Sequence, residues 1–366
     1  MPLYVGNTSN LARNVKDIYV GNSSSQARRV LTGYIGNSNN QAQKFYEASR
    51  NRWVVVGNNG FIATSTDNGN NWQSSYQGGF HLRGIDYGNG KWIAAGADQI
   101  IATSTDGINW TLRYDVGSGW SIIWETVKFA NNTWMLGGGA SSTYVNEIHS
   151  TYSYDNGETW DRCYHMFPGK IEGLCYNNDR WVGAGSNKRI NDNNSSPSMI
   201  TTTTSGLFNT WPQMAGISSQ GSGVIHGIDY GNGRWIAVGT VYDNPNTGFI
   251  YSSTDGLTWT RTNMSNNGNL WSGMTDIKFH NGRWMIVGQN GLIRTSTNGT
   301  SWTLNPIGSA MSLNAIDVNN NGLWMATGYR SNGQGIIVTS NDNGTTWSSM
   351  KDVPGASSML NDIVWA

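Results

Sequence analysis

Residues 65–72 read Ser-Thr-Asp-Asn-Gly-Asn-Asn-Trp (STDNGNNW), and the chain returns to this phrase again and again. The clear variants are STDGINW at 104–110, SYDNGETW at 153–160, STDGLTW at 253–259, STNGTSW at 296–302 and SNDNGTTW at 340–347. A degenerate copy, TTTSGLFNTW, occupies 202–211. Seven copies at regular intervals indicate a repeat architecture.

A fixed order of segments surrounds each copy. A short apolar segment such as LRGIDY (82–87) and a Gly/Asn turn precede a strand of the form Trp-x-x-x-Gly, as in WIAAG (92–96). A third strand then enters the phrase, and its tryptophan opens a fourth strand. Successive Trp-x-x-x-Gly tryptophans lie 39 to 54 residues apart. Four short strands per unit of this size predict an all-β, seven-bladed β-propeller.

The phrase itself is suited to the turn between the third and fourth strands. Its Ser and Asp oxygens can accept hydrogen bonds from the following backbone N–H groups. Its glycine supplies the positive φ that such a turn needs, and its tryptophan can be buried between sheets. The predicted structural residues of these turns are Asp67, Trp72, Asp106, Trp110, Asp155, Trp160, Asp255, Trp259, Asn298, Trp302, Asp342 and Trp347.

Both ends of the repeated region fit a closed ring. The chain ends with LNDIVWA (360–366), which has the form of a first strand with no unit after it. The first unit, at RNRWVVVG (50–57), lacks a convincing first strand. The C-terminal strand is therefore predicted to become the innermost strand of the first blade, which would cover the sheet edge that this blade would otherwise expose.

The phrase resembles the Asp-box, or BNR repeat, Ser-x-Asp-x-Gly-x-x-Trp, over about residues 50–366. This resemblance implies a propeller of the kind found in sialidases, in photosystem II assembly factors and in many other proteins, and it specifies no single function. The second, fifth and sixth copies are one residue short, the sixth has Asn298 in place of the acid, and the fourth has lost it.

The N-terminal 44 residues carry a different repeat. YVGN (4–7), YVGN (19–22) and YIGN (34–37) recur every 15 residues, and the segment has five basic side chains against one acidic. It resembles the YVGxxGxAR repeats at the ends of bacteriophage and prophage tail proteins, which implies attachment to a virion or oligomerisation. We therefore expect a β-hairpin-repeat attachment segment at 1–44 and the propeller at 45–366. An ordinary N-terminal tail is the alternative.

Bulk composition narrows the function. The 366 residues contain 23 basic and 23 acidic side chains, so no charge imbalance favours nucleic acid. Neither a secretory signal nor an apolar run long enough for a membrane helix is recognisable. The two cysteines, Cys163 and Cys175, are expected on different strands, as free buried thiols too far apart to bridge.

The sequence gives no support to an enzyme. It has five glutamates, and Glu158 falls in a repeat turn while Glu125 and Glu172 fall in first strands. The Arg-Ile-Pro phrase of sialidases is absent, and the five histidines lack paired ligand spacing. We predict no catalytic residue, metal or cofactor. A pair of carboxylates brought together from distant blades remains open, because sequence alone cannot locate one.

A binding face can nevertheless be predicted. Turns between strands one and two and between three and four share one face and are uniform. The other face carries the connections between blades and those between strands two and three, which vary from GNNGF (57–61) to GSNKRINDNNSSPSM (185–199). Insertions confined to one face of a repeat protein often mark its binding face. Aromatic and planar polar residues there suit sugars or proteins; the alternative for each residue is packing of its loop on its own blade. The candidates are Trp120, Tyr144, Arg189, Tyr242, Trp271 and Tyr329.

These observations predict a non-enzymatic bacteriophage tail protein for receptor binding and host attachment. Its propeller would recognise a host-surface glycan or protein, and residues 1–44 would bind other virion tail proteins. It would be made in the host cytoplasm and reside in the virion tail. The alternatives are a structural decoration or spacer protein of the virion, and a glycan-cleaving, sialidase-like enzyme. The oligomeric state is left open, with a homo-oligomer as one alternative.

Overall fold

The computed structural model describes residues 18–21, 27–30, 32–36, 42–47, 51–114, 122–140, 148–163, 169–187, 198–204, 213–214, 222–241, 247–264 and 273–366. The chain divides into two compact units, Met1–Arg50 and Asn51–Ala366. In the first unit, β1 (Ile18–Gly21) pairs antiparallel with β2 (Ala27–Val30), and β3 (Thr32–Gly36) pairs with β4 (Ala42–Glu47). Because β4 continues past residue 44, residues 45–50 group with this unit.

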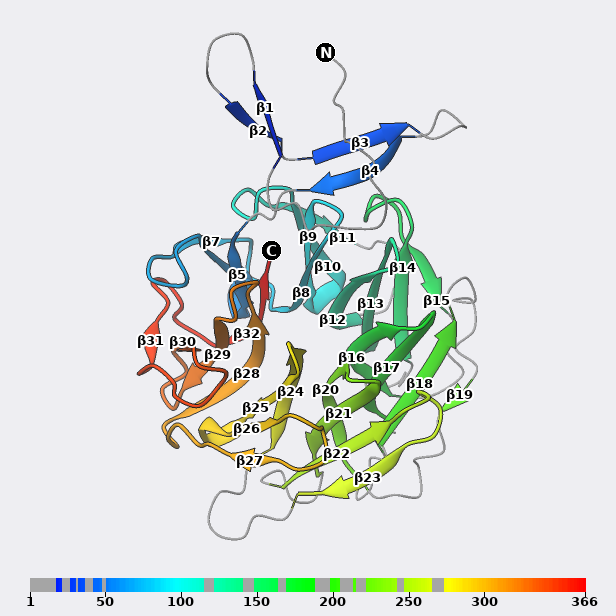
Figure 1. Cartoon of the computed structure of the whole chain (residues 1–366), viewed down its shortest axis with the longest axis vertical. Coiled ribbons are helices and arrows are strands. Elements are labelled where there is room, and N and C mark those ends of the chain that lie inside the picture. Colours follow the sequence, from blue (N-terminus) through cyan, green and yellow to red (C-terminus); the bar gives the residue numbers. More distant parts are fainter. Residues whose placement is uncertain are drawn as a thin grey trace, which may run out of the picture. The chain divides into compact units, whose positions relative to one another are not determined.

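The second unit consists of seven four-stranded antiparallel sheets arranged in a ring (Figure 1). Blade 1 holds β32 (Leu360–Trp365), β5 (Trp53–Gly57), β6 (Phe61–Ser65) and β7 (Gln73–Tyr76); blade 2 holds β8 (Leu82–Gly88), β9 (Lys91–Gly96), β10 (Ile100–Ser104) and β11 (Thr111–Tyr114). Blade 3 holds β12 (Ile122–Ala130), β13 (Thr133–Ala140), β14 (Ile148–Ser153) and β15 (Asp161–Cys163); blade 4 holds β16 (Lys170–Asn177), β17 (Arg180–Ser186), β18 (Ser198–Thr204) and β19 (Gln213–Met214).

The remaining blades repeat this order, from the inner to the outer strand. Blade 5 holds β20 (Val224–Gly231), β21 (Arg234–Thr240), β22 (Gly248–Ser253) and β23 (Thr260–Asn263). Blade 6 holds β24 (Met274–His280), β25 (Arg283–Gly288), β26 (Ile293–Ser296) and β27 (Thr303–Leu304). Blade 7 holds β28 (Met311–Val318), β29 (Trp324–Arg330), β30 (Gly335–Ser340) and β31 (Lys351–Asp352). The seven-bladed all-β fold predicted from the repeats is confirmed.

The helical content of the described residues is limited to three short 3-10 turns, η1 (Asn58–Gly60), η2 (Ala97–Gln99) and η3 (Gln289–Gly291). Each of them joins the second and third strands of a blade. None of the helices among the described residues has the length and apolar character needed to cross a membrane.

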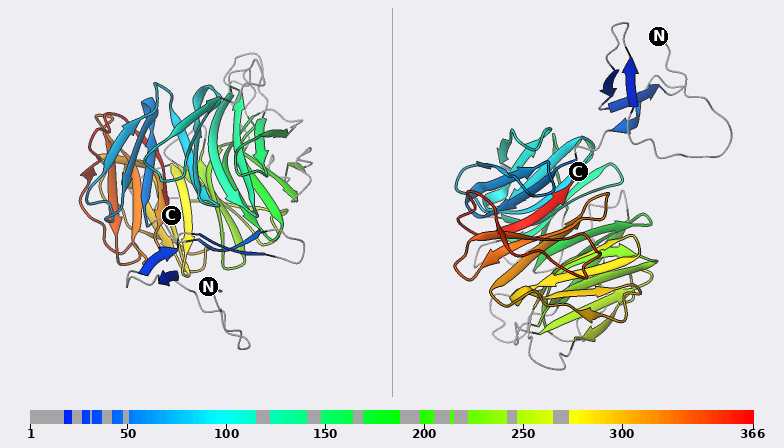
Figure 2. Two further views of the ribbon diagram at one scale, coloured as in Figure 1. Left: turned by 90° about the horizontal axis from the view of Figure 1, so that it is seen from above. Right: turned by 60° about the vertical axis from the view of Figure 1, so that its left-hand side comes forward.

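The C-terminal strand closes the ring, as predicted. Strand β32 pairs antiparallel with β5, and Trp365 lies opposite Trp53. Figure 2 shows this strand, in red, beside the blue strands that begin the propeller. The two strands are more than 300 residues apart in sequence, so the inner edge of blade 1 is covered by the far end of the chain.

The core consists of seven apolar layers, one between each pair of neighbouring blades. In WVVVG (53–57), Trp53 and Val55 pack toward blade 7, whereas Val54 and Val56 pack toward blade 2. Alternate side chains of a strand point to opposite faces, and here both faces are covered. That explains why these second strands are continuous apolar runs rather than alternating ones.

Where both repeated tryptophans of a unit are described, the first is the more deeply buried. The seven on the second strands are at most 2% exposed. Most of them contact an aromatic ring on the inner strand; for example, the Tyr87 and Trp92 ring centroids are 4.4 Å apart. Trp124, on an inner strand, is 1% exposed and also belongs to the core. Cys163 on β15 and Cys175 on β16 are free and buried, as predicted.

The polar phrases form tight turns at the end of the third strand of a blade. In the first, Asp67 Oδ1 accepts hydrogen bonds from the Ser65 hydroxyl (2.8 Å) and from the Asn70 and Asn71 backbone N–H groups (3.1 and 2.9 Å). Gly69 has φ +79°, and a Cβ there would approach the Met325 side chain of blade 7 to 2.7 Å. The turn therefore also fits against the preceding blade.

The copy without the acid makes the same turn. Asn298 Oδ1 accepts hydrogen bonds from the Ser296 hydroxyl (3.1 Å) and from the Thr300 and Ser301 N–H groups (2.9 Å each). An amide oxygen thus replaces the carboxylate oxygen without a change in the bonding pattern. The fourth copy, at 202–211, lies mostly outside the described residues.

Candidate binding site at the mouth of the central channel

The seven innermost strands share one irregularity. Each contains a β-bulge at the second residue of its repeated phrase, for instance at Arg83 in Leu82-Arg83-Gly84. A bulge leaves one residue unpaired and redirects its side chain. The bulged residues are Asn361, Arg83, Glu125, Glu172, His226, Thr275 and Asn314, in order from blade 1 to blade 7.

The glycine of the Trp-x-x-x-Gly motif makes room for this bulge. In every blade it pairs with the apolar residue just before the bulged one, as Gly96 does with Leu82. A Cβ at Gly96 would collide with the His81 carbonyl oxygen, and the equivalent glycines in the other blades are crowded in the same way. The glycine is therefore needed for close backbone approach, and it fixes all seven bulges at one level of the ring.

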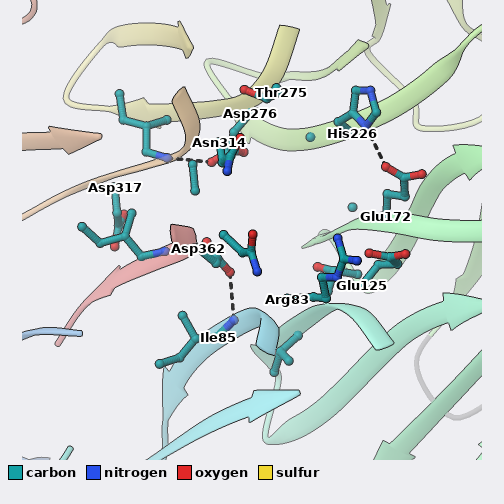
Figure 3. Close-up of a pocket in the computed structure, with 18 of the residues that line it drawn as sticks. Arg83, Ile85, Glu125, Glu172, His226, Thr275, Asp276, Asn314, Asp317 and Asp362 are labelled. Atoms are coloured by element: carbon teal, nitrogen blue, oxygen red, sulfur yellow. Dashed lines mark hydrogen bonds and ion pairs between the residues drawn. The ribbon is translucent and has the colours of Figure 1, made fainter. Parts of the chain in front are cut away.

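The bulged side chains line one end of a central cavity with a volume of about 370 Å³. The cavity is bounded by the inner strands of all seven blades and, on blade 7, also by Tyr329 from β29. Figure 3 shows Arg83, Glu125, Glu172 and His226 on one side of it, with Thr275, Asn314 and Asp362 on others. This volume lies near the lower end of the range for ligand pockets, about 300–1,000 Å³.

Three of the bulged residues form a neutral arc that joins neighbouring blades. The Thr275 hydroxyl donates to the Leu313 carbonyl (2.6 Å), and Asn314 Nδ2 donates to the Leu360 carbonyl (2.7 Å). Asn361 Nδ2 likewise donates to the carbonyl of Leu82, at 2.6 Å. Each of the three thus donates a hydrogen bond to the next blade, whereas the side-chain oxygens of the two asparagines remain acceptors in the cavity wall.

The opposite arc is charged. Lys170 Nζ lies 2.7 Å from Glu172 Oε1 and 3.4 Å from Glu125 Oε1, and His226 Nδ1 lies 2.6 Å from Glu172 Oε2. Burial opposes ionisation of Glu172, but the Lys170 ammonium and His226 outweigh it and hold its pKa at about 2. Glu172 is therefore an ionised hydrogen-bond acceptor at neutral pH.

Two residues at the mouth, Arg83 and Tyr329, have polar side-chain groups that form no hydrogen bond or ion pair with any described residue. Arg83 points into the cavity beside Glu125 (Figure 3), and its guanidinium makes no hydrogen bond or ion pair with any described residue. The Tyr329 hydroxyl likewise has no partner among them. Both side chains are partly exposed. They are hydrogen-bond donors that no described residue occupies.

Deeper in the channel, five aspartates bind the blades together. Each accepts a backbone N–H group of the next blade: Asp362 from Ile85, Asp86 from Phe129, Asp229 from Phe279, Asp276 from Ile316 and Asp317 from Trp365, at 2.7–2.9 Å. Asp317 also pairs with Lys278 (2.8 Å). Burial raises the pKa of Asp276 to about 7 and raises that of Asp362 well above its usual value.

Of the binding residues predicted from the sequence, one is placed in this site. Tyr329 lines the cavity, whereas Trp120, Tyr144, Arg189, Tyr242 and Trp271 lie outside the described residues. The strand ends that flank three of them, Ala140 with Ile148, Ser186 with Ser198 and Thr240 with Gly248, belong to the same rim as the bulges. Within the described ranges, no cluster of three or more His, Cys, Asp or Glu side chains could hold a metal ion.

The bulged residues were not identified from sequence, although a signal was present. Aligned on their apolar positions, the first-strand phrases LRGID, WETVK, IEGLC, IHGID, MTDIK, LNAID and LNDIV all carry a polar residue second. A polar position repeated seven times between two apolar positions is unexpected for a strand buried on both faces. It is explained by the bulge.

These features define a seven-bladed β-propeller with a polar channel mouth. Solved structures similar to it include YCF48 bound to D1 peptide (15% identity, 83% of this chain and 89% of that chain, TM-score 0.53). Others are YCF48 from Cyanidioschyzon merolae (12%, 86% and 91%, 0.54) and the WD40 β-propeller domain of Doa1 (14%, 79% and 86%, 0.51). At these identities the similarity establishes the fold alone. No protein-family model and no curated protein matches the sequence.

Proposed function

We propose that this chain is a non-enzymatic recognition protein of a bacteriophage tail, and that the channel mouth binds a receptor on the host surface. The observation that carries the proposal is the ring of seven bulged polar residues around a cavity of about 370 Å³. Bulges are commonly used to redirect side chains beside functional sites. A pocket with a few fixed polar groups is typical of ligand binding.

The state of the carboxylates supports binding rather than glycoside hydrolysis. A glycosidase needs a carboxylic acid that is still protonated near neutral pH. Glu172 is held ionised, and Lys170 forms ion pairs with both Glu172 and Glu125. Asp276 and Asp362 have raised pKa values, but both oxygens of each accept backbone N–H groups in the channel wall. Neither group resembles a mobile proton donor.

The tail assignment rests on the N-terminal repeats, which resemble those of bacteriophage tail proteins, while the repeated turns of the propeller resemble Asp-boxes. In this proposal the Met1–Arg50 unit attaches the protein to other virion proteins, and the propeller presents the mouth to the host. A spacer protein would need only the attachment to other virion proteins, and no binding of the host.

Binding of the labelled full-length protein to a panel of bacterial strains tests the proposal. We expect strain-specific binding that falls at least ten-fold in Glu172→Gln, which removes the charge but keeps the shape. Glu158→Gln is the matched control, because Glu158 lies in a turn at the opposite rim and is exposed. Equal binding by both variants would contradict a role for the mouth. Release of sugar from a bound strain would instead favour the enzyme, and no binding to any strain would favour the spacer.

A further inference from the structure

We propose that the mouth recognises the uncharged terminal residue of a saccharide chain, with Arg83 and Tyr329 as its principal unengaged donors. This inference rests on the proposed function and specifies its ligand. It follows from the enclosure of the site, the hydrogen-bonding groups left unused around it and their balance of charge.

Enclosure favours a chain end. The cavity has walls from all seven blades, because each inner strand contributes lining residues at the level of the bulges. A saccharide bound along its length needs a groove with two open sides. A cavity walled on every side admits one terminal ring from above and leaves the rest of the chain outside.

The unused hydrogen-bonding groups suit a ring of hydroxyls. A hydroxyl can both donate and accept, so it needs partners of both kinds. Arg83 and Tyr329 supply donors, while the Asn314 and Asn361 side-chain oxygens and the carboxylates of the charged arc supply acceptors. Planar guanidinium and carboxylate groups can bind two neighbouring groups at once. The tyrosine ring adds an apolar surface for the C–H face of a sugar.

The balance of charge favours a neutral ligand. At the level of the bulges, apart from His226, the carboxylates of Glu125 and Glu172 are balanced by Arg83 and by Lys170 beside them. Deeper in the same cavity, five aspartates face two lysines, so the site has no net positive charge. Lys170 is already paired with both carboxylates. A charged sugar would have to exchange its hydration for a site with no net opposite charge, and desolvation of an ion is costly. A neutral sugar incurs no such cost.

A partner protein fits these features less well. The centre of a protein interface is usually apolar, with aromatic anchors. Here every bulged residue is polar. The large hydrophobic side chains exposed among the described residues, Tyr76, Tyr154 and Leu257, do not line the cavity.

A glycan array with matched pairs tests the proposal with the full-length protein. One set presents a neutral hexose at the chain end, a second presents the same hexose oxidised to its uronic acid, and a third extends the neutral chain by one residue. We expect the neutral ends to bind at least ten-fold more strongly than the oxidised ends. We also expect the array signal of a bound glycan to fall at least ten-fold when one more residue is added to its terminal sugar.

Two variants locate the interaction. Arg83→Gln should reduce the signal at least ten-fold. Tyr329→Phe, which removes a hydroxyl that bonds no described residue, should reduce it several-fold while leaving the near-ultraviolet circular dichroism unchanged. Glu158→Gln is the control and should bind normally. A preference for uronic acids, equal binding of internal residues, or unchanged binding by both variants would overturn the inference.

Failure of the inference differs from failure of the proposed function. Strain binding that depends on Glu172, without any binding to neutral chain ends, would overturn the saccharide inference and leave the receptor-binding proposal standing. Absence of both strain and glycan binding would overturn both.

Discussion

Replacement of Asp255 tests whether the repeated turns depend on an acceptor oxygen or on a charge. Asp255 Oδ1 accepts hydrogen bonds from the Ser253 hydroxyl (2.9 Å) and from the Leu257 and Thr258 N–H groups (2.8 Å each). The neighbouring blade has a turn of the same length in which Asn298 makes the equivalent bonds. The protein thus contains its own asparagine variant.

The expected magnitudes follow from these bonds. Asp255→Ala leaves two backbone donors and a hydroxyl without their acceptor, much like the loss of a helix N-cap, and should lower the unfolding free energy by about 1–2 kcal/mol. Asp255→Asn keeps the oxygen and loses only the charge. Because the side chain is exposed and screened, that loss should cost less than about 1 kcal/mol. Asn298→Ala should cost as much as Asp255→Ala.

The pH dependence gives a second test. Hydrogen bonds from the Thr258 and Leu257 N–H groups hold the pKa of Asp255 at about 2, below its value in an unfolded chain. A carboxylate with a lowered folded pKa contributes stability that is present above its unfolded pKa and lost as the pH falls toward the folded one. The advantage of wild type over Asp255→Asn should therefore be full at pH 7 and smaller at pH 3.

Urea unfolding followed by tryptophan fluorescence measures these differences, since the unfolding free energy falls linearly with denaturant. If Asp255→Asn and Asp255→Ala lowered the unfolding free energy equally at pH 7, the charge rather than the acceptor oxygen would be what stabilises the turn. An Asn298→Ala variant as stable as wild type would refute the hydrogen-bond account altogether.

Three further predictions concern the channel, the bulges and the thiols. Burial raises the folded pKa of Asp276 to about 7, so its contribution to stability is present below about pH 4 and lost as the pH rises through 7. Urea unfolding should therefore give a lower unfolding free energy at pH 8 than at pH 5, and this difference should be smaller in Asp276→Asn. Gly96→Ala should destabilise by about 1–3 kcal/mol through overpacking against the His81 carbonyl, whereas Gly79→Ala, whose Cβ meets nothing within 4 Å, should be nearly neutral by thermal unfolding. Cys163 and Cys175 are both buried, and burial raises the pKa of the Cys175 thiol. A thiol reagent should therefore titrate two groups in denaturant and react far more slowly with the native protein. Rapid reaction in the native state would contradict the burial.

Much of the fold could be predicted because its signals are local and repeated. The Trp-x-x-x-Gly strands and the polar turns recur seven times, and the leftover LNDIVWA strand (360–366) predicted the closure. The site could not be predicted in the same way. Of the candidate binding residues, Tyr329 is placed in the cavity wall, and the others lie outside the described residues.

By itself the sequence determined the number of blades, the turn chemistry and the closing strand, because each depends on residues within one repeat or on a count of repeats. It also contained the polar position of the first strands, whose meaning stayed hidden. Only the tertiary structure decided that the glycine of each second strand permits a bulge, and that Arg83, Glu172 and Tyr329 meet around one cavity. Closure of the ring brings together residues from separate blades; Lys170 and His226 lower the pKa of Glu172 there, whereas burial raises that of Asp276. Such effects depend on distances in space, which no repeat period specifies.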